Sequence, residues 1–122
     1  QNAMLWALIT KISDNVNASH REDDTMKIYC DLLVRANAQY VILAIEPKAK
    51  HLLESQFRVV QELPNSLTTD KGKFMQGFKC FIGSSKYNSK EMTELLELAL
   101  DMAHEVGIID NDIQNIRETY KL

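Results

Sequence analysis

The sequence predicts an all-α fold, an irregular bundle of five to six amphipathic helices. Apolar residues recur at three- and four-residue spacings along nearly the whole chain, which is the helical period. Glycine and proline are scarce, with four and two among 122 residues, whereas turn-rich β folds need more of both. This length fits one domain. We assign that domain to residues 4–122 and interpret Gln1-Asn2-Ala3 before Met4 as an expression remnant.

The first helix is predicted by one apolar stripe, which consists of Leu5, Leu8, Ile9, Ile12 and Val16. A second helix is predicted from Ser19 to about Ile45. Its opening SHREDD pairs Ser19 with Glu22 three residues later, which is a capping-box pattern. A metal site there would need further ligands converging from one face, and none is evident. An alternative remains for YVILAIE (40–46), which is β-rich, ends at a proline and is also compatible with a buried strand.

Two further helices are predicted in the middle of the chain. Pro47 suits the first position of a third helix that ends before Pro64. A weaker fourth helix is predicted from about Thr69 to Ile82, and it contains the helix-weakening Gly72 and Gly77.

The C-terminal part carries the clearest helix signals. A fifth helix opens with a capping box, Asn88 to Glu91, and Gly107 suits a left-handed residue at its end. A sixth helix is predicted to start near Asp110. These local signals place the two helices as consecutive neighbours.

The chain contains no catalytic or cofactor motif that we can identify. It lacks a Gly-rich phosphate loop, an HExxH pair, a nucleophile elbow and an EF-hand loop. Cys30 and Cys80 lie within apolar patterns and without CxxC spacing, so we expect free thiols in the core. The sequence therefore predicts a protein that is not an enzyme and binds no metal or cofactor. No signal peptide or membrane-spanning segment is recognisable, which favours a cytoplasmic protein.

The stretch ALDMAHEVGIIDNDIQNIRE (99–118) resembles the helix-turn-helix motif of DNA-binding proteins. Ala103 is small where two helices would approach, and Gly107 lies in the turn. The resemblance implies that the second helix enters the major groove. In that arrangement Asn111, Gln114 and Asn115 would face the base edges. The same spacing is equally typical of an ordinary helical corner.

Charge is segregated along the sequence. Residues 47–90 contain eight Lys or Arg and three acidic residues, whereas residues 91–118 contain eight acidic residues and one Arg. Because affinity for DNA comes largely from cations that neutralise phosphates, the acidic segment makes nucleic acid an unlikely partner. The acidic helix face is instead suited to a protein partner with a basic surface.

We therefore predict a small protein–protein interaction module of the adaptor, inhibitor or immunity type, with a helix-turn-helix regulator as the alternative. The predicted contact residues are four carboxylates along the fifth helix and two tyrosines near the ends of the acidic C-terminal region: Glu94, Glu97, Asp101, Glu105, Tyr87 and Tyr120. The sequence leaves the oligomeric state open.

Overall fold

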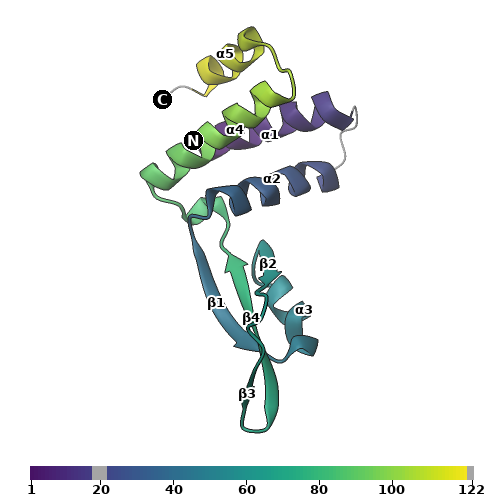
Figure 1. Ribbon diagram of the computed structural model, residues 1–122. Coiled ribbons are helices and arrows are strands. Elements are labelled where there is room, and N and C mark those ends of the chain that lie inside the picture. Colours follow the sequence, from purple (N-terminus) through teal and green to yellow (C-terminus); the bar gives the residue numbers. More distant parts are fainter. Residues whose placement is uncertain (18–21, 121–122) are drawn as a thin grey trace.

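The protein has two lobes, one made of helices and one built on an antiparallel sheet (Figure 1). A computed structural model describes residues 1–17 and 22–120. Within them lie five α-helices and a four-stranded sheet, so the prediction of an all-α helical bundle is wrong. The errors in secondary structure lie in the middle of the chain, where residues 40–81 supply all the strands that the structure describes.

The helical lobe is assembled from both ends of the chain. It contains α1 (Asn2–Asn17), α2 (Glu22–Ala36), α4 (Ser89–Glu105) and α5 (Asp110–Thr119). Apolar stripes on all four helices meet in one core, which is centred on Leu8, Leu33, Leu95 and other fully buried side chains. The predicted stripe of the first helix is buried except for Val16, whose side chain is 55% exposed. The predicted cap at Ser19 lies outside the described residues.

The second helix ends nine residues earlier than predicted. After Ala36, Asn37 takes a left-handed conformation with φ of 49°, and the chain then enters β1 (Tyr40–Ile45). β-Branched and aromatic side chains dominate this segment, and such residues favour extended backbone. The strand that the sequence left as an alternative is therefore present, but most of its residues are exposed rather than buried.

The predicted third and fourth helices are replaced by short elements. Pro47 starts a 3₁₀ turn, η1 (Pro47–Ala49), which leads into the five-residue α3 (Lys50–Glu54). Three strands follow: β2 (Val59–Glu62), β3 (Thr68–Asp70) and β4 (Lys73–Phe81). Lys71 and Gly72 both have positive φ, which is the backbone of a two-residue hairpin turn between β3 and β4. Gly72, which was expected to weaken a helix, instead supplies the positive φ that this hairpin turn needs.

The long strand β4 is the centre of the sheet. It pairs antiparallel with β1 on one side and with β2 on the other, so the order is β1-β4-β2, and β3 pairs with the start of β4. A small second core joins α3 to the sheet and contains buried Leu53, Phe78 and Cys80. β1 is therefore an edge strand, and its outer side is not paired within the described chain.

Hydrogen bonds between polar groups join the two lobes. The hydroxyl of Tyr29 in α2 accepts the backbone N–H of Ser84 at 2.7 Å, and Ser84 Oγ lies 2.8 Å from Asn2 Oδ1 in α1. Gln39, just before β1, donates from its side chain to the carbonyl of Lys86 and to the carboxylate of Glu91. The start of β1 is thus tied to the N-terminus of α4.

Candidate interaction surfaces

The outer edge of β1 presents unpaired backbone groups. Ile82 N–H donates to the carbonyl of Gln39, and in an antiparallel ladder the hydrogen-bonded positions alternate. Val41, Leu43 and Ile45 therefore direct their N–H and C=O groups to β4. The backbone groups of Tyr40, Ile42 and Ala44 point away from the sheet. We call this strand, with its outward-facing backbone groups, the open edge.

The side chains of the open edge are apolar and accessible. Ile42 is 61% exposed, Tyr40 is 39% exposed, and Val41 and Leu43 are each 37% exposed. No charged residue, proline or bulge interrupts β1. Proteins usually protect an exposed edge with one of these devices, because an unprotected edge pairs readily with another chain.

The opposite edge of the sheet is protected. β2 has only four residues, and Gln61 and Glu62 in its second half are exposed. Pro64 follows two positions after its end and lacks the N–H that a ladder needs. β2 therefore has protective features that β1 lacks.

A charged group lies at each end of the open edge. The ammonium group of Lys79 lies 4.1 Å from the ring centre of Tyr40 and also donates to the side-chain oxygen of Asn37. At the other end, the carboxylate of Glu46 lies 3.5 Å from the ammonium groups of both Lys48 and Lys73. The start of β1 is therefore next to a cation and its end is followed by an anion.

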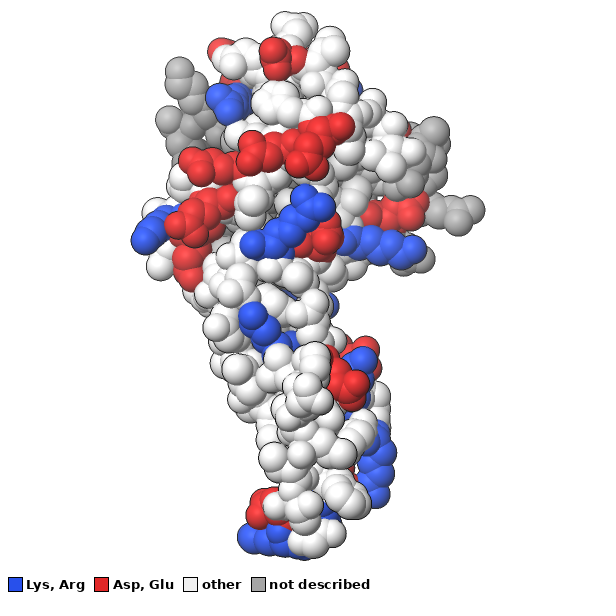
Figure 2. Space-filling model, viewed as in Figure 1, with Lys and Arg blue, Asp and Glu red and all other residues white. Residues whose placement is uncertain are grey.

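The helical lobe carries a separate acidic surface. Glu94, Glu97, Asp101 and Glu105 are all exposed along α4, opposite its core-facing residues, and we call these four residues the acidic stripe. None of the four carboxylates forms an ion pair or hydrogen bond with another side chain in the part of the chain that the structure describes. Figure 2 shows Asp and Glu side chains gathered over the helical lobe, while much of the visible sheet lobe is uncharged.

The two predicted tyrosine anchors lie in different environments. Tyr87 is half-buried against the helical core, and burial raises the pKa of its hydroxyl. Tyr120 is 39% exposed and lines a shallow groove between α1 and α5 with Trp6 and Ile116. Only Tyr120 is therefore accessible enough to contact a partner directly.

The predicted helix-turn-helix residues are exposed, but their helix packs differently from the motif. Asn111, Gln114 and Asn115 all lie on the outer side of α5. α5 contacts mainly α1, and the ammonium of Lys11 lies 3.4 Å from the carboxylate of Asp112. In the motif the second helix packs on the first, which here would be α4. α4 and α5 therefore form an ordinary helical corner in which α5 packs on α1.

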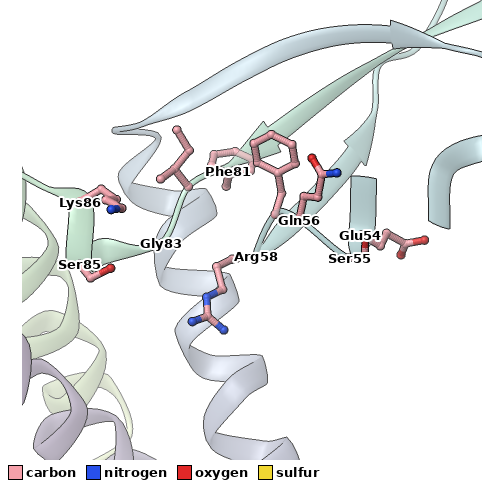
Figure 3. Close-up of a pocket in the computed structure, with 10 residues that line it drawn as sticks. Glu54, Ser55, Gln56, Arg58, Phe81, Gly83, Ser85 and Lys86 are labelled. Carbon is pink, nitrogen blue, oxygen red and sulfur yellow. The ribbon is translucent and has the colours of Figure 1, made fainter. Parts of the chain in front are cut away.

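A pocket of about 390 Å³ opens between the lobes, where Arg58 and Lys86 lie near Phe81 (Figure 3). The labelled polar side chains come from two segments and point in different directions, with the carboxylate of Glu54 directed away from the guanidinium of Arg58. No nucleophile, base and acid converge there, so the pocket gives no support for a catalytic site.

Both cysteines are free thiols. Cys80 is buried in the sheet core and Cys30 is half-buried on α2. Burial raises the pKa of both thiols, and the nearby charge of Arg58 offsets part of this rise at Cys30. Within residues 1–17 and 22–120, no three potential ligand side chains come together to hold a metal ion, and no helix is long and apolar enough to span a membrane.

Comparison with known proteins finds no matching family model, no similar curated protein and no similar solved structure. The sites are therefore assigned from geometry alone. Sequence reasoning placed the acidic stripe on one helix face but missed the open edge. The available signal was YVILAI itself, a run of β-forming residues without a single charge.

Proposed function

We propose that this chain is a protein–protein interaction protein that binds another polypeptide strand along the open edge. The observation that carries the proposal is the row of outward backbone groups at Tyr40, Ile42 and Ala44 beside exposed apolar side chains. Strand addition of this kind obtains affinity from main-chain hydrogen bonds and specificity from alternate side chains.

The apolar side chains add to the backbone contribution. Burying a mostly exposed isoleucine such as Ile42 contributes roughly 1.5–3 kcal/mol. Neighbouring Val41 and Leu43, each about one-third exposed, would lose further apolar surface on the opposite face of the strand. A strand laid along β1 therefore gains from both faces of the sheet as well as from its edge.

The acidic stripe supports a second contact in the same function. Four carboxylates that have no side-chain partner among the described residues, on one face of a core-packed helix, favour a protein with a basic surface. Such charge complementarity acts mainly on the rate and salt dependence of association. The chain would then act as an adaptor, with a strand partner on the sheet lobe and a basic partner on the helical lobe.

The cytoplasm is the compartment that fits this function. The two thiols remain unpaired, and their pKa values lie above the ordinary range because of burial. Reducing compartments keep such thiols free, whereas secreted domains commonly pair them.

Binding at the open edge is tested by residue-resolved amide exchange. The protein is labelled in dilute solution alone and then with proteins captured from its host. We expect Tyr40, Ile42 and Ala44 to exchange fast alone and slowly in the complex, while Val41 and Leu43 stay protected by β4 throughout. Fast exchange at Tyr40, Ile42 and Ala44 both in the free chain and in a saturated complex would contradict the proposal.

Matched variants separate the two surfaces in the same capture. Ile42→Lys places a charge on the open edge, and Leu52→Lys places one on the exposed side of α3 as a control. Glu97→Lys with Asp101→Lys reverses the centre of the acidic stripe. We expect loss of the strand partner from Ile42→Lys, loss of any basic partner from the stripe variant, and parental capture by Leu52→Lys. A folded stripe variant that captures everything the parent does would exclude the stripe as a contact.

A further inference from the structure

We propose that the strand that covers the open edge is β1 of a second copy of this chain, paired antiparallel about a two-fold axis at Ile42. This inference rests on the proposed function and names the partner of the same surface. In this register Ile42 lies opposite Ile42 of the second copy, and Tyr40 lies opposite its Ala44. The six-residue strand then extends the sheet across two molecules.

The hydrogen-bonding pattern suits this register. The outward groups belong to Tyr40, Ile42 and Ala44, which are placed symmetrically about Ile42. An antiparallel pair with Ile42 at its centre makes all three positions hydrogen-bonded on both strands. A shift by one residue would place outward groups opposite inward ones, and a shift by two would leave one end unpaired.

The boundaries of the strand have the same symmetry. On the N-terminal side, the positive φ of Asn37 interrupts the extended backbone. On the C-terminal side, Pro47 has no backbone N–H to donate to a neighbouring strand. Each lies five residues from Ile42. When β1 is paired with its copy, Asn37 of each chain therefore lies opposite Pro47 of the other. The pairing then includes every residue of β1.

The side chains of the paired strands are complementary in size, and none of them is charged. The large ring of Tyr40 faces the small Ala44, and the strand places no charged residue against itself. Glu46 of one copy falls opposite Ala38 of the other, on the face that carries Tyr40. The Glu46 carboxylate is already paired with Lys48 and Lys73 of its own chain, so it brings no unpaired negative charge to the interface.

Charge variants at the symmetry axis test the inference by light scattering or sedimentation of the untagged chain. We expect the parent to be a dimer, and Ile42→Lys and Ile42→Glu each to raise the dimer dissociation constant at least about 100-fold. An equimolar mixture of the two variants should re-form a dimer, because Lys and Glu then face one another. Leu52→Lys should remain dimeric.

A cross-link tests the register without relying on those variants. Opposed Cα atoms at the axis would lie about 5.5 Å apart, which suits a disulfide. The two Ala44 Cα atoms would lie about 14 Å apart, which is too far. Mild oxidation should therefore link Ile42→Cys into a covalent dimer and leave Ala44→Cys and the parent unlinked. Linking of Ala44→Cys in place of Ile42→Cys would overturn the register.

The possible failures are distinguishable. A monomeric parent, or a dimer unaffected by the Ile42 charge variants, would overturn the second-copy inference. If the monomeric parent still captures another protein through Ile42, the occupant is an unrelated strand and the proposed function stands. If neither a second copy nor another protein protects the outward amides, both proposals fail.

Discussion

At the scale of single residues, Glu91 connects the two lobes through one carboxylate oxygen. This oxygen accepts the backbone N–H of Asn88 at 3.1 Å and the side-chain amide of Gln39 at 2.8 Å. The Asn88 side chain in turn accepts the N–H of Glu91, which completes the predicted capping box. The backbone hydrogen bond is the main reason that the pKa of Glu91 lies below its usual range, and the bond from Gln39 adds to it.

A lowered pKa makes this contact dependent on pH. Because the folded state holds the proton more weakly than the unfolded state, the stabilisation by Glu91 is present above the unfolded pKa and is lost as pH falls through the folded pKa. We expect Glu91→Gln to be less stable than the parent at pH 7, with the difference shrinking between about pH 5 and pH 3. Urea unfolding at a series of pH values measures this.

The control is Glu94→Gln, since Glu94 is exposed and has no side-chain partner among the described residues. Its unfolding free energy should follow the parent closely across the series. An equal loss for Glu91→Gln at pH 3 and at pH 7 would mean that the charge of Glu91 contributes nothing.

At the scale of elements, the fold of β4 depends on a close approach at Gly77. The loop after β2 folds back so that Ser66 Oγ donates to the carbonyl of Leu63 at 2.6 Å and accepts the N–H of Gly77 at 3.1 Å. A Cβ atom at Gly77 would lie 2.9 Å from this oxygen. Because the hydrogen bonds hold Ser66 in place, the clash is not easily relieved.

We expect Gly77→Ala to lower the free energy of unfolding by roughly 1–3 kcal/mol, as overpacking commonly does. Denaturant unfolding gives the value. In a Ser66→Gly background the same substitution should cost less than about 0.5 kcal/mol, because the obstructing side chain is gone. If Gly77→Ala lowered the free energy of unfolding equally in both backgrounds, the Ser66 side chain would not be the source of the strain.

Local signals were predictable from the sequence, whereas long-range pairing was not. Three predicted features depend only on residues that are close in sequence, and all three are confirmed. They are the capping box from Asn88 to Glu91, the left-handed conformation of Gly107 and the start of α5 at Asp110. β1 and β2 pair with β4 across long stretches of chain, and the apolar spacing of residues 40–81 also fits a helix. The acidic stripe was recognisable because one helix determines it. The open edge was not, because only sheet order decides which strand lies outermost.

At the scale of the whole molecule, charge is divided between the lobes. Residues 37–87 carry seven Lys or Arg and four acidic residues, while α4 and α5 are strongly acidic. The exposed side of α5 that would face DNA carries Asp110 and Glu118. Phosphates would therefore be repelled where the motif requires attraction.

We expect negligible affinity for duplex DNA near physiological salt. A mobility-shift assay with random and host genomic fragments measures it. The double variant Gln114→Ala and Asn115→Ala should behave like the parent. Sub-micromolar, salt-sensitive binding that this variant abolishes would instead establish the helix-turn-helix function.

The assembly of the helical lobe from both chain ends has a consequence for biosynthesis. α1 and α2 leave the ribosome before the α4 residues that cover them, which follow only after the entire sheet lobe. At ordinary translation rates, residues 37–105 take roughly 3–14 s to synthesise. During that interval the apolar faces of α1 and α2 and the strand YVILAI are uncovered together on one nascent chain. A chaperone that shields apolar segments during translation would therefore improve the yield of folded protein more than one that acts after release.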